Sequence, residues 1–223
     1  QLTTLEGGKH TVLVPSGQTA IAVVFLAVLK PGDTVLIPDS AYPPVTGFCR
    51  NFLSPLGITH RVYRPDASNL EAQIDASVKL IWMEAPGSTT MEVQDVPAIV
   101  ALARRHGILT GIDNTWATPI FLPPHALGID MAIEAGTKYL SGHSDLLLGL
   151  TSANAKWAQR LRYTFDHFAM LAGPEDAFPG LRGIRTLELR LREAQAQGLA
   201  MAHWLAARPE VRLVLHPAFP ECP

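Results

Sequence analysis

Residues Val96–Asp113 read VPAIVALARRHGILTGID and contain the pattern that best indicates the fold. Residues Val96–His106 place apolar side chains at helical spacing, and Gly107 is a residue type that commonly ends helices. The apolar run Ile108–Asp113 then has the length and composition of a buried strand. A helix that leads directly into such a strand is the repeating unit of a parallel sheet covered by helices.

The same alternation continues along the chain. We expect strands at Thr34–Pro38, His60–Tyr63, Leu80–Glu84, Ile108–Asp113, Met131–Ala135 and Leu146–Ser152. We expect helices at Gln18–Leu29, Pro44–Leu53, Asn69–Ile74, Val96–His106, Ala155–Phe168 and Leu187–Ala207. This order predicts an α/β fold of three layers, α-β-α, around a mostly parallel sheet. Ligands of such sheets bind beyond the carboxyl ends of the strands.

Composition narrows the class of protein. The chain has 223 residues, of which 48% are hydrophobic and 17% charged, a balance that favours a well-buried globular core. The net charge of -2, without a basic run, gives no indication of nucleic-acid binding. No apolar stretch is long enough to cross a bilayer, so we expect no membrane association. The histidines lack metal-ligand spacing, so we expect no metal site.

The cysteines indicate a cellular compartment, and the chain ends indicate a longer parent chain. Cys49 and Cys222 are the only cysteines, which fits a reducing, cytoplasmic compartment and excludes a disulfide scaffold. The sequence opens on Gln1 rather than Met and closes on a proline-rich segment that follows a strand-like run. We therefore expect both ends to be cut from a longer chain. We assign residues 1–186 to one large domain and 187–223 to a connecting helix and the start of a further domain.

Lys138 and Asp113 are the residues most suggestive of chemistry. Lys138 lies in a small, polar, uncharged stretch, and Asp113 ends an apolar strand. A lysine can hold an aldehyde as a Schiff base, and a buried carboxylate can hold a protonated pyridine nitrogen, so the pair suits pyridoxal 5'-phosphate. Taken singly, each has an ordinary alternative: a solvated surface lysine, and a strand-end aspartate that caps a turn. Thr137 offers a hydroxyl to a phosphate.

Two further motifs suit the same cofactor. Ser16-Gly17-Gln18 opens a helix, where free backbone amides and the helix dipole favour an anion such as phosphate. A serine there also serves as a plain helix cap. Tyr42 lies on a loop after a predicted strand, where its ring could stack on a flat cofactor or merely pack, and its hydroxyl could transfer a proton.

Together these motifs resemble the cystathionine-metabolising branch of the fold-type I pyridoxal phosphate enzymes. The resemblance covers nearly the whole chain. It rests on Ser16–Gln18, Ala41-Tyr42, Glu84–Ile99, Asp113–Ala117, Gly136–Asp145 and Arg182–Leu187. It implies the aminotransferase-like large domain, with Lys138 as the Schiff-base and proton-shuttling residue, Asp113 as the pyridinium partner and Tyr42 stacked on the ring. Gly17, Gln18 and Thr137 would hold the phosphate.

The resemblance also implies a reaction. Gly87-Ser88-Thr89 stands where relatives acting at the gamma carbon often carry Ser-Asn-Pro, which favours beta-elimination from cystathionine to give homocysteine, pyruvate and ammonia. A cysteine or cystine desulfhydrase, a gamma-acting relative and a catalytically inert fragment are the alternatives. Ala135 replaces a serine found in many relatives, so one phosphate contact differs.

The resemblance further implies a homotetramer built from dimers with shared active sites. Family members extend beyond both ends of this sequence. Their additional segments usually supply the neighbouring subunit's phosphate contacts and the arginine that binds the substrate carboxylate. No residue of this chain matches those groups.

Overall fold

The computed structural model describes residues 1–220 and 222, and its centre is a seven-stranded sheet. The strands are β1 (His10–Val14), β2 (Thr34–Pro38), β3 (Thr59–Tyr63), β4 (Val78–Glu84), β5 (Leu109–Asp113), β6 (Met131–Glu134) and β7 (Gly149–Ala153). Their order is β1-β7-β6-β5-β4-β2-β3. The pairs from β6 to β3 are parallel, and β7 is antiparallel to both β6 and β1. The predicted α/β class with a mostly parallel sheet is confirmed.

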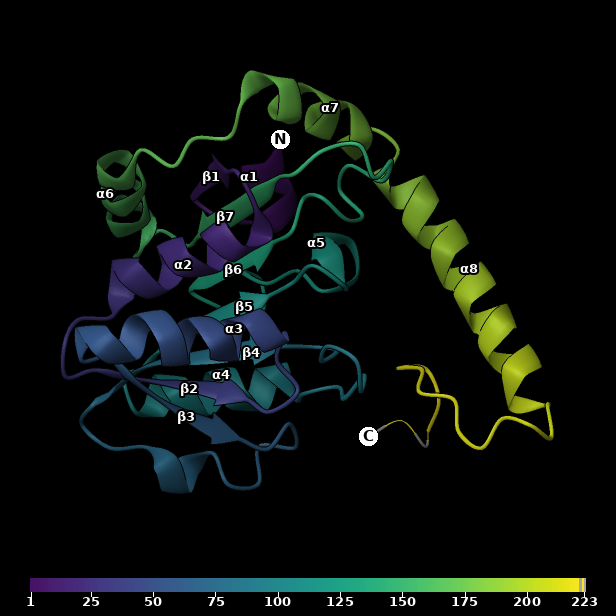
Figure 1. Ribbon diagram of the computed structural model, residues 1–223, viewed down its shortest axis with the longest axis horizontal. Coiled ribbons are helices and arrows are strands. Elements are labelled where there is room, and N and C mark those ends of the chain that lie inside the picture. Colours follow the sequence, from purple (N-terminus) through teal and green to yellow (C-terminus); the bar gives the residue numbers. More distant parts are fainter. Residues whose placement is uncertain (221, 223) are drawn as a thin grey trace.

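Helices cover both faces of this sheet (Figure 1). The longer ones are α2 (Gly17–Val28), α4 (Val96–Arg105), α6 (Ala158–Phe168), α7 (Pro174–Ile184) and α8 (Leu187–Ala206). The shorter ones are α1 (Leu2–Glu6), α3 (Pro43–Phe48) and α5 (Thr118–Phe121). A wider helical turn, Cys49–Leu53, continues α3, and single turns occupy Ser54–Leu56 and Glu71–Gln73.

The alternation of side chains along β4 divides the core in two. Leu80 and Trp82 belong to the cluster under α2, whereas Ile81 and Met83 belong to the cluster that includes α4. Trp82 meets Phe25 of α2 edge to face, with ring centroids 5.1 Å apart. Both faces of a central strand are thus buried, which explains why its sequence is an almost continuous apolar run.

Several predicted elements need correction. The strand β1 and the helix α7 were not expected, and the predicted helix Asn69–Ile74 is only the single turn Glu71–Gln73. The strand predicted at Leu146–Ser152 begins later, at Gly149. The helix α7 carries Pro179 in its interior, a residue that ordinarily argues against a helix. The helix α8 lies close to its predicted bounds, and the division of the chain at residue 186 stays a prediction.

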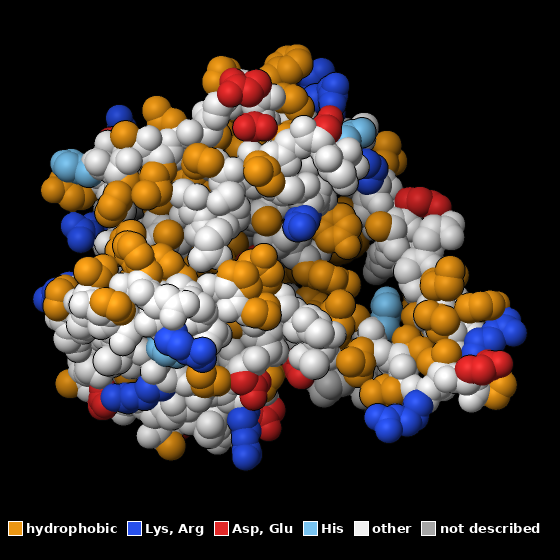
Figure 2. Space-filling view, viewed as in Figure 1, with side chains coloured by type: hydrophobic (Ala, Val, Ile, Leu, Met, Phe, Trp, Pro, Cys, Tyr) orange, Lys and Arg blue, Asp and Glu red, His pale blue; other side chains and the backbone are white. Residues whose placement is uncertain are grey.

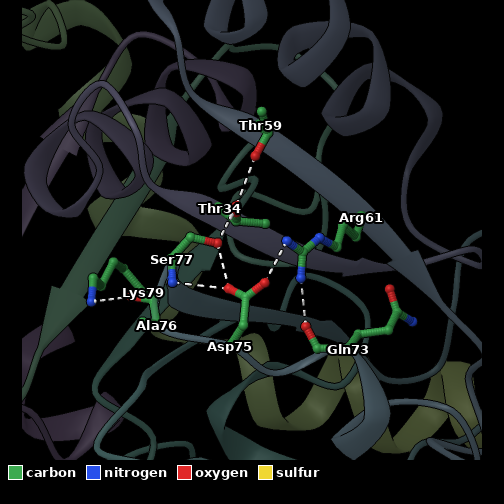
Figure 3. Close-up of polar contacts among 8 residues, drawn as sticks. All are labelled: Thr34, Thr59, Arg61, Gln73, Asp75, Ala76, Ser77 and Lys79. Atoms are coloured by element: carbon green, nitrogen blue, oxygen red, sulfur yellow. Dashed lines mark hydrogen bonds and ion pairs between the residues drawn. The ribbon is translucent and has the colours of Figure 1, made fainter.

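A polar cluster fixes the ends of the strands that lie away from the candidate site (Figure 3). The hydroxyl of Thr34, the first residue of β2, bonds to those of Thr59 (2.7 Å) and Ser77 (2.9 Å). The Ser77 side chain and amide donate to Asp75, which also pairs with Arg61 at 2.7 Å. These hydrogen bonds lower the pKa of Asp75 to about 2, with those from Ser77 contributing most. The cluster connects the first residues of β2 and β3 with the turn that precedes β4.

The last helix stands away from the sheet. In Figure 1, α8 leads from α7 past the edge of the domain, and only three of its residues, Leu187, Leu191 and Ala202, are buried. Figure 2 shows hydrophobic side chains gathered over α8 and the segment after it; the exposed ones include Leu189, Met201, Trp204 and Leu213. Within the described residues, no helix is both long enough and apolar enough to cross a membrane.

Candidate active site

A cleft of about 1380 Å³ opens beyond the carboxyl ends of β4 and β5. The strands β2 and β4 are neighbours in the sheet. The next strand along the chain after β2, which is β3, lies on one side of this pair, and the next strand after β4, which is β5, lies on the other, so the chain order reverses between them. Ligands of α/β sheets bind at such switch points. All the site residues predicted from the sequence line this cleft: Gly17, Gln18, Tyr42, Asp113, Thr137 and Lys138. Their roles toward a cofactor stay predictions.

Asp113 lies in the floor of the cleft at the last position of β5. One oxygen accepts the amide of Thr115 at 3.0 Å. Burial raises the pKa of Asp113, and the hydrogen bonds from Thr115 oppose that rise. No salt bridge among residues 1–220 and 222 reaches this carboxylate. Asp113 is half-buried where it lines the cleft, and a partly buried carboxylate without a cation is costly, so the position suits a ligand that brings a positive charge.

Lys138 follows β6 on a tight turn and is exposed toward the cleft. Its amide donates to the carbonyl of Ala135 (2.9 Å), and its carbonyl accepts the amide of Gly142 (2.9 Å). The Ser141 hydroxyl donates to the Thr137 carbonyl at 3.0 Å. These bonds fix the backbone of the turn, and within the described part of the chain no salt bridge engages the Lys138 amine, so it is available to a ligand.

The Thr137 hydroxyl, which was predicted to bind a phosphate, already makes two hydrogen bonds within the protein. It donates to the carbonyl of Leu148 (3.2 Å) and accepts the amide of the same residue (3.0 Å). The single hydroxyl proton is therefore directed at the protein. A bond from this hydroxyl to a phosphate needs rotation of the side chain, and that contact stays a prediction.

The start of α2 forms another wall of the cleft. The Ser16 hydroxyl caps the helix by accepting the Thr19 amide at 3.1 Å. The amides of Gly17 and Gln18, in the first turn, have no partner within the helix and are available to an anion. The side-chain oxygen of Gln18 is buried without a partner in the described structure. At Gly17, a β-carbon would lie 2.8 Å from that of Ala135, so glycine lets the helix start approach the end of β6.

Tyr42 and Glu84 meet at the switch point. Tyr42, 44% exposed, follows β2, and its amide donates to the carboxylate of Glu84 at 2.7 Å. Glu84 pairs with Asp113 in the register of β4 and β5, so the two carboxylates share one face of the sheet. Burial, followed by the neighbouring charge of Asp113, raises the pKa of Glu84 to about 7. Glu84 was not predicted as a site residue, although it also ends an apolar strand.

Arg190 was likewise missed, because it lies within the predicted helix Leu187–Ala207, where no site residue was expected. Its guanidinium reaches back from α8 and donates to the carbonyls of Tyr139 (2.6 Å), Leu140 (3.3 Å) and Gly183 (2.9 Å). Arg190 therefore ties the turn that carries Lys138 to the junction of α7 and α8. Among residues 1–220 and 222, no group of three His, Cys, Asp or Glu side chains is placed to hold a metal ion.

Comparisons with known proteins agree with this geometry. The family model described as "Cys/Met metabolism PLP-dependent enzyme" matches residues 1–223. A protein of Saccharomyces cerevisiae is 50% identical over 222 residues, which are 99% of this chain and 65% of the relative. Cystathionine beta-lyase MetC of Escherichia coli is 41% identical over 219 residues, 97% of this chain and 55% of the relative.

A solved structure has the same fold. The crystal structure of metB from Corynebacterium glutamicum superposes with a TM-score of 0.96 at 28% identity, covering 99% of this chain and 58% of the other. The chain thus spans between about half and two thirds of the length of these relatives.

Proposed function

The chain belongs to the Cys/Met metabolism PLP-dependent enzymes, and from this premise we propose that it forms the cofactor-binding part of a carbon–sulfur beta-lyase. The proposed substrate is cystathionine, and the products are homocysteine, pyruvate and ammonia. The observation that carries the proposal is the convergence of Lys138 and Asp113 on one cleft, together with the free amides at the start of α2. The name and identity of the Escherichia coli relative support the choice of substrate.

The residues of the cleft fit pyridoxal 5'-phosphate. The Asp113 carboxylate, which has no cationic partner among the described residues, would hold the protonated pyridine nitrogen. The amides of Gly17 and Gln18 would bind the phosphate at the helix start. Tyr42 would stack on the ring, and the Lys138 amine would hold the aldehyde. Each contact uses a group that the fold leaves available.

When bound, the cofactor supplies an electron sink for the electron pair left on the substrate's alpha carbon. Asp113 would keep the pyridine nitrogen protonated, because its negative charge favours the cationic form. Lys138, released from the aldehyde when the substrate's amino group takes its place, would remove the proton from the alpha carbon as general base. The Cβ–S bond would then break, and the sulfur would take up a proton and leave as the thiol of homocysteine. The remaining three-carbon unit would take up water and leave as pyruvate and ammonia.

The exposed apolar residues of α8 fit the homo-oligomer that we propose for the whole protein. Single exposed apolar side chains are common, but Met201 and Trp204 lie about one turn apart on α8 and are both more than half exposed, and such neighbouring residues are typical of an interface. Light scattering of the full-length protein should give a mass of several chains. A monomer at micromolar concentration would contradict this part of the proposal.

The reaction itself is tested with the full-length protein, pyridoxal 5'-phosphate and cystathionine. We expect pyruvate and a free thiol in equal amounts, and no thiol with Lys138→Ala. Formation of 2-oxobutyrate in place of pyruvate would show cleavage at the gamma carbon and contradict the assignment. Turnover of cysteine or cystine in preference to cystathionine would contradict the proposed substrate, but the reaction would still be a beta-elimination.

A further inference from the structure

Glu84 is a buried carboxylate, 7% exposed, at the point where two loops of the cleft meet. One oxygen accepts the Tyr42 amide at 2.7 Å, and the other accepts the Ser88 hydroxyl at 2.5 Å. Tyr42 belongs to the loop after β2, and Ser88 to the loop after β4. A single side chain therefore connects the two loops.

The loops also touch directly. The Ser88 amide donates to the carbonyl of Ser40 at 2.8 Å. At Gly87, a β-carbon would lie 2.5 Å from that of Ser40, so the backbones approach as closely as glycine permits. Thr89 and Met91 have φ of 74° and 63°, in the left-handed region that residues other than glycine rarely adopt. The loop after β4 is held in a conformation that needs support from its neighbours.

We propose that Glu84 is a positioning residue, which fixes the Tyr42 ring and the Ser88 loop around the cofactor ring. The proposal rests on the proposed function, because Tyr42 is the group that would stack on the cofactor. The Glu84 carboxylate acts through the backbone of Tyr42 and the hydroxyl of Ser88, which occupy its two oxygens. Its place beside Asp113 in the sheet register keeps this support next to the pyridine-binding carboxylate.

Tyr63 provides a matched control for Glu84, because both belong to one series of buried hydrogen bonds. The Glu84 amide donates to the side chain of Gln94 (2.9 Å), which in turn donates to the Tyr63 hydroxyl (2.9 Å). Tyr63 is buried and donates to the Trp82 carbonyl at 2.7 Å, away from the cleft. Tyr63→Phe removes buried hydrogen bonds of this chain without touching Tyr42 or Ser88.

The test compares Glu84→Ala, Glu84→Gln and Tyr63→Phe in the full-length protein. Glu84→Ala should lower kcat/KM by about tenfold or more, the value of one lost charge-assisted hydrogen bond. It should also reduce the visible circular dichroism of the bound cofactor. Glu84→Gln keeps an oxygen for the Tyr42 amide and should stay within about threefold of the parent protein. Tyr63→Phe should lower stability and leave kcat/KM and dichroism within about twofold.

Unchanged kcat/KM and dichroism in Glu84→Ala would overturn the proposal. An equal loss in Tyr63→Phe would also overturn it, because a general loss of stability would then explain both. If Glu84→Ala does not fold, Ser88→Ala decides, since it removes one of the two contacts and leaves little space. We expect about a threefold fall in kcat/KM for Ser88→Ala, and no fall would count against the proposal.

One readout separates this inference from the proposed function. In the cofactor-free protein, the Tyr42 amide should exchange its hydrogen at least about tenfold faster in Glu84→Ala than in Tyr63→Phe, because its acceptor is gone. Equal exchange rates would refute the positioning contact even if the enzyme is active. Faster exchange together with a parent protein that binds no cofactor at Lys138 would refute the proposed function and leave the contact standing.

Discussion

Replacing Glu84 by Gln should stabilise the cofactor-free protein at alkaline pH. The pKa of this carboxyl rises from its ordinary value of 4.5 to about 7, chiefly through burial and next through Asp113. Between these two values the folded protein binds the proton more tightly than the unfolded chain does. The stability contributed by Glu84 is therefore fully present below about pH 4.5 and is lost as the pH rises through 7.

The size of the effect follows from the two pKa values. At 1.36 kcal/mol per pKa unit, the change from 4.5 to about 7 corresponds to about 3 kcal/mol, of which about 2–3 kcal/mol falls between pH 5 and pH 8. Glutamine has nearly the same shape, and its oxygen can still accept the Tyr42 amide. It has no charge to gain, so the variant should lack this part of the pH dependence.

The assay is urea unfolding of the cofactor-free protein at pH 5 and pH 8. The stability of Glu84→Gln relative to the parent protein should increase by about 2–3 kcal/mol between the two pH values. Glu71→Gln is the control, because Glu71 is 65% exposed and its pairs with Arg105 and His106 lie at the surface. The same relative stability of Glu84→Gln at both pH values would show that the pKa of Glu84 is not raised in the folded protein.

Three further predictions use the same cleft. Gly17→Ala should cost about 1–3 kcal/mol and weaken cofactor binding, since its new methyl group would lie 2.8 Å from the β-carbon of Ala135. Gly47→Ala, which meets nothing within 4 Å, should be neutral or gain up to about 1 kcal/mol, and equal denaturation curves would contradict this contrast. Asp113→Asn should lose pyridoxal 5'-phosphate at least about tenfold more readily on dialysis, because the ring nitrogen loses its charged partner; equal retention would argue against the pairing. Arg190→Ala leaves carbonyls of the Lys138 turn unpaired and should lower stability by about 1–3 kcal/mol and slow cofactor attachment; attachment at the parent rate would contradict that role.

Much of the sheet could be predicted because its strands are buried on both faces. Thr34–Pro38 lies at its predicted bounds, and β4 and β5 end at the predicted residues Glu84 and Asp113. The strand β1 was harder, since it lies at the sheet edge and pairs only with β7, far away in sequence. The helix α7 was hidden by Pro179 and its glycines, whose helical conformation depends on packing rather than on propensity.

The sequence could indicate which strands end in acids but not which acids share a face. Asp113 lies opposite Glu84 on one side and Ile133 on the other, so these residues point to the same face of the sheet. Glu134, one residue further on, points to the opposite face. There it is buried against Glu6, and burial together with Glu6 raises its pKa well above the ordinary value. This difference between Asp113 and Glu134 follows from the register of the strands, which is known only from the folded sheet.

Arg190 illustrates a second limit of prediction from the sequence. Its spacing on α8 indicates only a polar face, and its partners Tyr139 and Leu140 are carbonyl groups that any residue could provide. A contact between a side chain and a distant backbone leaves no pattern in the sequence. By contrast, Lys138 and Asp113 could be placed near one another from the sequence, because each lies at or just past the end of a predicted strand of a parallel sheet and both line the cleft at the carboxyl ends of those strands.

The proposed role of Lys138 as the holder of the cofactor's aldehyde can be measured on the lysine itself. The full-length protein is reduced with borohydride in the presence of pyridoxal 5'-phosphate, digested and examined by mass spectrometry. We expect a reduced pyridoxyl-phosphate group on the peptide that contains Lys138, and its loss in Lys138→Ala. A modified lysine elsewhere with Lys138 unmodified, or no covalent attachment at all, would exclude this role.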